Sequence, residues 1–252
     1  MNSPIITIDG PVASGKGTIA RLLAEALGFH LLDSGAIYRA HAQACLTEAI
    51  DFNNIRALAD KARVLSLKFS GDRILLNGAD ATDAIRSETV GMAASTLSAI
   101  PQVRTALMQR QRDFSQPPGL VADGRDMGTI VFPDAALKIY LTATAHVRAE
   151  RRSAQVARQR LVAGESMSAK QLIEKGKSPT IASLLETIQA QVLPDVEAQI
   201  RQRDSQDKSR EIAPLKPAID AIVIDNAAHS PDETVAAILK LWQLRLASAQ
   251  AL

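Results

Sequence analysis

The stretch from Ile5 to Gly28 constrains the fold more than any other part of this chain. Residues 5–9 (IITID) form an apolar run, and residues 10–18 (GPVASGKGT) are small except for one lysine. Residues 19–27 then place apolar side chains at helical spacing, and Gly28 follows at a helix C-terminal position. This order predicts a strand, a tight loop and a helix.

Such a loop can hold a phosphate group, because its backbone N–H groups, the helix N-terminus and the lysine all favour an anion. The usual pattern has Ser or Thr directly after the lysine, whereas here Gly17 intervenes and the hydroxyl arrives at Thr18. An ordinary tight turn before a helix is the alternative, but the spacing favours phosphate binding. The candidate loop residues are Gly10, Pro11, Val12, Ala13, Ser14, Gly15, Lys16, Gly17 and Thr18.

Composition narrows the class of protein further. The chain has 252 residues, of which 46% are hydrophobic and 22% charged, as in soluble globular proteins of one large or two small domains. A net charge of +2 and only 3% aromatic residues argue against a nucleic acid or a membrane surface as the main partner. Cys45 is the only cysteine, and no apolar run reaches the ~18 residues of a membrane span. We therefore expect a cytoplasmic protein.

Strand and helix patterns alternate along most of the chain. Further strands are predicted at 29–32, 120–122, 137–141 and 221–225, with helices near 36–45, 88–112, 148–160 and 230–247. This alternation favours an α/β fold with a five-stranded parallel sheet covered on both faces. The helical stretch 88–112 should break at Ile100-Pro101, since the residue before a proline disfavours helical geometry.

Between residues 45 and 85 the pattern changes. A short helix (58–65) precedes short strands at 66–69, 74–76 and 81–83, and Asn77-Gly78 between two of them is a hairpin signal. We expect a small α+β insert within the α/β protein.

Polar residues follow the predicted strands where each strand ends. Asp33, Ser34 and Arg39 follow the second strand, and the sequence DGRD (123–126) follows the third. Since ligands of parallel α/β sheets bind beyond the carboxyl ends of the strands, these turns should converge with the phosphate loop. Arginine binds phosphate bidentately, so the turns predict a site for a second anionic ligand.

The same segments resemble bacterial cytidylate kinases. The resemblance rests on ITIDGP leading into GKGT (6–18), on LDSGAIYR (32–39) and on ADGRDMGT (122–129). It extends to LNG (76–78), to AS (94–95) and to a closing signature around Arg203, Asp207 and Arg210, in order from about residue 5 to 226. It implies a P-loop NTPase core (1–40, 98–148 and 204–252), an NMP-binding insert (41–97) and an extended helical lid (149–203).

The resemblance also implies an activity, the phosphorylation of CMP or dCMP by ATP with Mg²⁺. It assigns Lys16, Arg39 and Arg125 to catalysis, the loop 10–18 to the ATP phosphates, and Thr18 to Mg²⁺, directly or through water. The acceptor nucleotide would contact residues from four parts of the chain, namely Ser34, Arg39, Ser95, Arg104, Asp123, Arg125, Asp126, Arg203, Asp207 and Arg210. From the residues alone, Arg203, Asp207 and Arg210 could instead form a solvated helix face with i,i+3 and i,i+4 ion pairs.

The lid departs from the family pattern. Arg148 and Arg152 are expected to contact ATP there, but Gln206 stands where some relatives have another arginine. Residues 153–202 are also a few dozen residues longer than a short lid requires, and a helical extension that alters lid packing is the simplest interpretation.

Two other functions remain open at this point. A kinase acting on UMP or AMP would carry the same loop, and a nucleotide-dependent switch or RNA-associated NTPase would use it without a second nucleotide site. The arginines after the second and third strands argue against such a switch. The expected partners are ATP, CMP and dCMP, and we expect a monomer.

Overall fold

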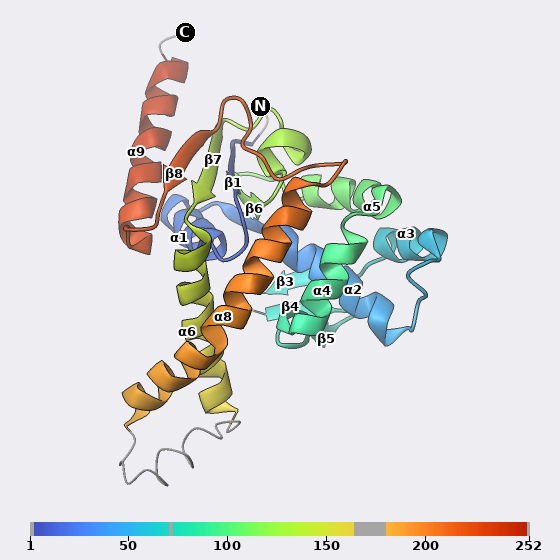
Figure 1. Ribbon diagram of the computed structural model, residues 1–252. Coiled ribbons are helices and arrows are strands. Elements are labelled where there is room, and N and C mark those ends of the chain that lie inside the picture. The colour runs from blue at the N-terminus through green and yellow to red at the C-terminus, as the bar shows by residue number, and fades with distance from the viewer. Residues whose placement is uncertain (1–2, 71–72, 164–179, 251–252) are drawn as a thin grey trace, which may run out of the picture.

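A five-stranded parallel sheet forms the centre of the protein in the computed structural model, which describes residues 3–70, 73–163 and 180–250 (Figure 1). The strand order is β2-β6-β1-β7-β8, and every neighbouring pair is parallel. The predicted α/β core is thus confirmed. Its strands are β1 (Ile5–Asp9), β2 (His30–Asp33), β6 (Leu120–Gly124), β7 (Leu137–Thr142) and β8 (Ile222–Asp225).

Helices cover both faces of this sheet, which explains why its central strands read as continuous apolar runs. In β6, Leu120 and Ala122 pack with α2 (Ser34–Thr47) and α5 (Pro101–Arg112), whereas Val121 packs on the opposite face. The opposite face is covered by α1 (Lys16–Leu27) and α9 (Pro231–Gln250). Figure 1 shows α9 standing beside β8 at the edge of the molecule.

The predicted α+β insert contains a second, antiparallel sheet with the order β3-β4-β5. Asn77 (φ 52°) and Gly78 (φ 83°) both adopt left-handed conformations, as a two-residue hairpin turn requires. The strand predicted at 81–83 is wrong, because this tight turn places the returning strand at 79–80. The Thr82 hydroxyl instead accepts a hydrogen bond from the Ile74 N–H. The insert consists of α3 (Ile55–Arg63), β3 (Leu67–Ser70), β4 (Arg73–Leu76), β5 (Ala79–Asp80), η1 (Ala84–Arg86) and α4 (Glu88–Leu97).

The helical stretch between the insert and β6 breaks where it was predicted to. Helix α4 ends at Leu97, Ile100 is extended (ψ 117°), and Pro101 opens α5 at its first position. Beyond β6, a single π-helical turn, η2 (Met127–Val131), leads toward β7.

Two long helices, α6 (Ala145–Val162) and α8 (Ile181–Lys208), project together from the sheet as a hairpin (Figure 1). Small and branched apolar residues join them, including Ala149, Ala157, Ile188 and Val196. Ser178-Pro179 predicts a helix start in the sequence, since proline suits the first helical position, but residues 164–179 between the two helices lie outside the described part of the chain. Within the described part, no helix is both long enough and apolar enough to cross a membrane.

Candidate active site

The predicted phosphate loop lies between β1 and α1, and its backbone is tightly curled. Gly10 adopts φ 151°, and a Cβ there would lie 2.1 Å from the carbonyl oxygen of Leu141, so no side chain fits. Ala13 (φ 58°) and Gly15 (φ 89°) both lie in the left-handed region, which costs a non-glycine residue roughly 1 kcal/mol. Such conformations turn successive N–H groups toward a common centre, as an anion-binding loop requires.

Lys16, the first residue of α1, folds its side chain back onto the phosphate loop. Its Nζ donates to the carbonyl oxygen of Pro11 at 2.8 Å, and the residue is only 6% exposed. Burial lowers the pKa of Lys16, with Arg125 contributing further, while Asp123 and Asp9 oppose the shift. Asp9 accepts hydrogen bonds from the N–H groups of Met127 and Gly128, and burial nevertheless raises its pKa to about 6. The buried carboxyl groups of Asp9 and Asp123 thus favour the charged form of the lysine, against its burial.

The residues present beside the loop suit a magnesium ion. Thr18 is exposed to the cleft, and an Asp123 carboxylate oxygen lies 3.4 Å from where a Cβ of Gly17 would be, so oxygen donors flank the loop. Among the described residues, no group of three or more acidic, histidine or cysteine side chains could enclose an ion. Thr18 and Asp123 are the kind of oxygen donors that Mg²⁺ takes, usually one or two from the protein, with water and substrate phosphates completing its shell.

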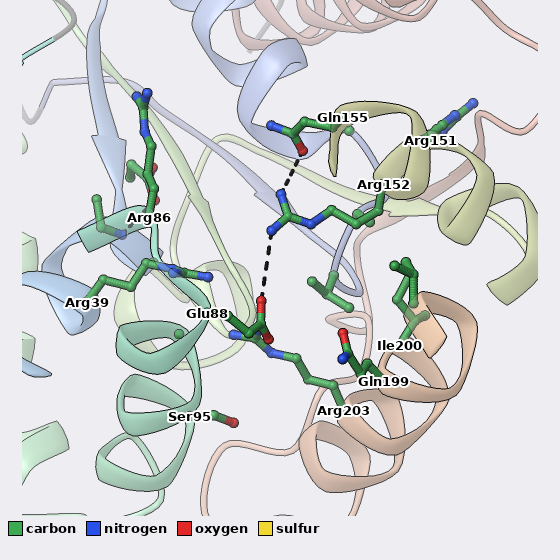
Figure 2. Close-up of a pocket in the computed structure, with 18 of the residues that line it drawn as sticks. Arg39, Arg86, Glu88, Ser95, Arg151, Arg152, Gln155, Gln199, Ile200 and Arg203 are labelled. Carbon is green, nitrogen blue, oxygen red and sulfur yellow. Dashed lines mark hydrogen bonds and ion pairs between the residues drawn. The ribbon is translucent and has the colours of Figure 1, made fainter. Parts of the chain in front are cut away.

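A cleft of about 1400 Å³ opens in front of the loop, between the insert and the α6–α8 hairpin (Figure 2). It brings together residues that are far apart in the sequence. The predicted site residues that line it are Val12, Ala13, Gly15, Thr18, Arg39, Ser95, Arg152, Arg203 and Arg210. Gln206, the position that departs from the family pattern, lines it as well.

Three of these residues, Arg39, Arg152 and Arg203, come from α2, α6 and α8, and we call them the cleft arginines. Arg39 donates to the carbonyl oxygens of Ile85 (2.9 Å) and Ser87 (3.2 Å). It passes so close to α4 that a Cβ at Gly91 would lie 2.9 Å from its Nη2. One acid, with 58% of its side chain exposed, acts on all three, while Asp33 also acts on Arg39 and Asp207 on Arg203.

That acid is Glu88, the first residue of α4, whose carboxylate lies 3.9 Å from Nη2 of Arg152. Figure 2 shows this ion pair crossing the cleft from the α6–α8 hairpin to the insert. The Nε of Arg203 is buried without a hydrogen-bond partner. Burial, followed by repulsion from Arg125, lowers the pKa of Arg203 to about 10, and burial likewise lowers that of Arg39. The residues lining the cleft therefore carry more positive than negative charge.

A second set of arginines lies deeper and is paired with carboxylates. Arg104 (7% exposed) forms an ion pair with Asp126 (4% exposed), donates to the Ser98 carbonyl oxygen at 3.1 Å and lies 5.8 Å from the centre of the Tyr38 ring. Nearby, the Ser34 hydroxyl donates to Oε1 of Gln111 at 2.6 Å. Arg104 and Asp126 thus present a fixed donor and a fixed acceptor side by side.

Asp207 joins two further arginines at the end of α8. Its carboxylate accepts from Nε of Arg125 at 3.0 Å and lies 2.5 Å from Nη2 of Arg210. Burial works to raise the pKa of Asp207, but Arg125 and Arg210 outweigh it and the pKa is lowered. Because the Asp207 side chain is only 2% exposed, the alternative of a solvated helix face is wrong for this residue.

The two predicted lid arginines differ in position. Arg152 faces the cleft, whereas Arg148 is buried and donates to the carbonyl oxygens of Ala143 (2.9 Å) and Val12 (3.0 Å) and to Asp204. Arg148 thereby ties α6 to both the phosphate loop and α8. Its contact with ATP stays a prediction. The predicted residues that are not among those lining the cleft are Gly10, Pro11, Ser14, Lys16, Gly17, Ser34, Arg104, Asp123, Arg125, Asp126, Arg148 and Asp207.

Cleft residues that the sequence did not point to include Arg86, Glu88 and Asn226. Arg86 and Glu88 flank η1 and the start of α4, where the sequence shows only an ordinary helix cap. Asn226 directly follows β8, so the rule that polar residues after strands face the site could have identified it.

Comparison with known proteins settles which family shares this arrangement. The family profile described as cytidylate kinase matches residues 6–178 and 181–244. The chain belongs to the cytidylate kinase family. The cytidylate kinase of Bordetella bronchiseptica is 46% identical over 96% of this chain and 96% of its own length. Those of Ralstonia pickettii (47% identical; 96% and 93%) and Stutzerimonas stutzeri (48% identical; 94% and 93%) are similarly related. Membership of this family makes the chain a phosphotransferase.

Proposed function

We propose that the protein transfers the γ-phosphoryl group of ATP to CMP or dCMP, giving ADP and CDP or dCDP. The observation that carries this proposal is the meeting of the phosphate loop and the cleft arginines around one cleft, with the Arg104–Asp126 pair behind it. In this arrangement the segments 1–40, 98–148 and 204–252 act as the core, 41–97 as the NMP-binding insert and 149–203 as the lid.

The phosphate loop is assigned to the donor. Residues 10–18 would hold the ATP phosphates through backbone N–H groups, and Lys16 would follow the transferring group. Thr18 would hold Mg²⁺, with Asp123 near Gly17 as a further oxygen donor, and the ion would supply positive charge that neutralises the phosphates. Arg152, which faces the cleft from α6, is the lid residue best placed to reach the same phosphates, and Arg148 would support them from behind the loop.

The acceptor is assigned to the insert side. Arg39 and Arg125 would bind the phosphate of CMP, while Arg203, Asp207 and Arg210 would surround the ribose. Cytosine presents an exocyclic amine that donates and ring atoms that accept, which matches a carboxylate beside an arginine. Asp126 would accept from the amine and Arg104 would donate to the ring, with Ser34 and Ser95 nearby. Uracil presents a carbonyl oxygen in place of the amine and would meet Asp126 unfavourably.

This chemistry needs no general base. The second pKa of a phosphate monoester is near 6, so the attacking oxygen of CMP is already mostly anionic at neutral pH. Catalysis then consists of aligning two polyanions, excluding water and compensating charge, which suits an arginine-rich cleft.

The decisive experiment follows ADP release in a coupled assay with ATP, Mg²⁺ and one of four acceptors: CMP, dCMP, UMP or AMP. We expect turnover with CMP and dCMP and at least about 100-fold lower kcat/KM with UMP and AMP, since buried polar groups left unpaired discriminate strongly. Turnover that prefers UMP or AMP would identify a different monophosphate kinase. ATP hydrolysis that is indifferent to every acceptor would contradict the proposal and favour a nucleotide-dependent switch.

A further inference from the structure

Asn226, the residue directly after β8, links three parts of the fold that lie far apart in the sequence. Its backbone N–H donates to the Thr142 carbonyl oxygen at the end of β7 (3.0 Å), which continues the sheet by one more hydrogen bond. Its side-chain Nδ2 donates to the carbonyl oxygen of Ser14 in the phosphate loop at 2.8 Å, across 212 residues. The residue is only 4% exposed.

The hydrogen bond to Ser14 supplies a donor to a carbonyl group of the phosphate loop. When such a loop turns its N–H groups inward toward an anion, its carbonyl groups face the protein and need buried donors. Ser14 is completely buried, and its neighbours Ala13 and Gly15 are the two residues of the loop with left-handed backbones between Gly10 and the helix. Unusual backbone conformations persist only where the surroundings hold them. The Asn226 amide supplies such support from outside the loop.

Arg151, on α6 of the lid hairpin, holds the other side of Asn226. Its Nη2 donates to the carbonyl oxygens of Asn226 (2.7 Å) and Ala227 (3.2 Å), and its Nη1 donates to Oδ1 of Asn226 (3.3 Å). Figure 2 shows the side chain of Arg151 directed away from that of the next residue, Arg152, which extends toward Glu88. One turn of α6 therefore extends Arg152 toward Glu88 and anchors itself to Asn226 through Arg151, and both arginines line the cleft.

We infer that Asn226 is a positioning residue that couples the lid to the phosphate loop through the chain Arg151–Asn226–Ser14. Any movement of α6 acts on the same amide that holds the Ser14 carbonyl, so lid position and loop geometry are linked. The inference rests on the proposed function, in which the loop holds the phosphates of ATP. It predicts that substitutions in this chain of residues weaken the binding of ATP and leave the binding of CMP unchanged.

Three variants test the chain link by link. Asn226→Ala removes both side-chain hydrogen bonds, Asn226→Asp keeps the acceptor for Arg151 but loses the donor to Ser14, and Arg151→Met removes the lid contact alone. We expect both Asn226 variants to weaken ATP binding about tenfold, or ~1.4 kcal/mol. Arg151→Met should weaken it about threefold. The KM for CMP should stay within about twofold in all three, and the KM for ATP should rise with its dissociation constant.

The double variant Asn226→Ala with Arg151→Met decides whether the two residues act together. If they form one chain, the double variant should bind ATP no more weakly than Asn226→Ala alone, because residues in one hydrogen-bond network are not additive. Additive losses, unchanged ATP affinity in the Asn226 variants, or an equal rise of both KM values would overturn the inference. Arg151→Met alters a half-buried side chain on the lid and supplies the test even if Asn226 variants fold poorly.

A matched control lies at the other end of the same strand pair. There Lys138 of β7 forms a hydrogen-bonded ion pair with Asp220, just before β8, at 2.9 Å. Asp220→Asn should lower Tm without changing ATP affinity, which separates positioning from general stability. Because ATP binding is titrated without an acceptor, the result does not depend on CMP turnover. A protein that binds ATP as expected but fails to phosphorylate CMP would contradict the proposed function and leave this inference standing.

Discussion

The arginines of the site fall into two groups that differ in their partners. Deep in the site, Arg104 is paired with Asp126, and Arg125 and Arg210 share Asp207. In the cleft, Glu88 acts on Arg39, Arg152 and Arg203 together, with Asp33 also acting on Arg39 and Asp207 on Arg203. The pKa values record this contrast. Burial opposes the charge of Arg125, but Asp207 outweighs it and raises the pKa, whereas burial and Arg125 together lower the pKa of Arg203 to about 10.

This difference concerns how far each group is ordered before a ligand arrives. Paired arginines are already fixed in position, so they can contact a ligand at little ordering cost. The cleft arginines repel one another, and an arriving phosphate supplies the missing negative charge. Their repulsion should therefore be relieved most where two phosphorylated ligands meet, which is where charge develops during transfer.

The largest expected effect comes from the paired group. Arg125→Ala should lower kcat/KM for CMP by about 1000-fold, since it removes the proposed contact with the CMP phosphate and leaves Asp207 without one of its two ion-pair partners. ATP binding should change by less than about threefold, because the phosphate loop is not altered. Steady-state kinetics with varied CMP and a separate ATP titration measure the two effects.

The control for this variant is Arg56→Ala, which removes an arginine exposed at 94% of its side chain on α3. It should leave both constants unchanged. Equal losses of ATP and CMP affinity in Arg125→Ala would mean that this residue serves both nucleotides, and the division between the two groups would fail.

A smaller effect is expected when the Arg104–Asp126 pair, which we propose contacts the base, loses its carboxylate. Asp126→Asn should destabilise the fold by ~3 kcal/mol, because it leaves Arg104 buried and partly unpaired. It should also narrow the preference for CMP over UMP, since an amide can donate to a uracil carbonyl. Urea unfolding and the acceptor assay measure these effects. The comparison variant Asp60→Asn, at an exposed pair with Arg63, should cost ~1 kcal/mol or less. Similar losses of unfolding free energy in Asp126→Asn and Asp60→Asn would show that burial does not make the Arg104–Asp126 pair more important for stability than the exposed pair.

Local patterns predicted most of the fold. The five strands of the sheet, the break at Pro101 and the hairpin at Asn77-Gly78 each depend on neighbouring residues, and all are confirmed. The strand predicted at 81–83 was wrong by two residues, because hydrophobic pattern alone does not fix where a two-residue turn returns the chain. The turns after β2 and β6 were expected near the phosphate loop, and Arg39 does line the same cleft.

Partners across the fold could not be predicted in the same way. Asn226 and Ser14 are 212 residues apart, and the residues around either one give no indication that the two form a hydrogen bond. The two lid arginines Arg148 and Arg152 look alike in sequence, yet the helix directs one into the protein and the other into the cleft. Glu88 was read only as part of a helix start. Its role depends on three arginines that the fold brings to it from other helices.

The smallest effect tests the cleft group directly. Glu88→Gln removes the negative charge among Arg39, Arg152 and Arg203, so it should strengthen binding of ATP and CMP about twofold to threefold at low salt. The gain should be modest, because the pair with Arg152 is 3.9 Å long and partly exposed, and it should shrink as salt screens the charges. Glu186→Gln, an equal charge change at an exposed position on α8, should have no such effect. Weaker nucleotide binding in Glu88→Gln would show that the carboxylate positions these arginines for the ligand instead of occupying the place of its charge.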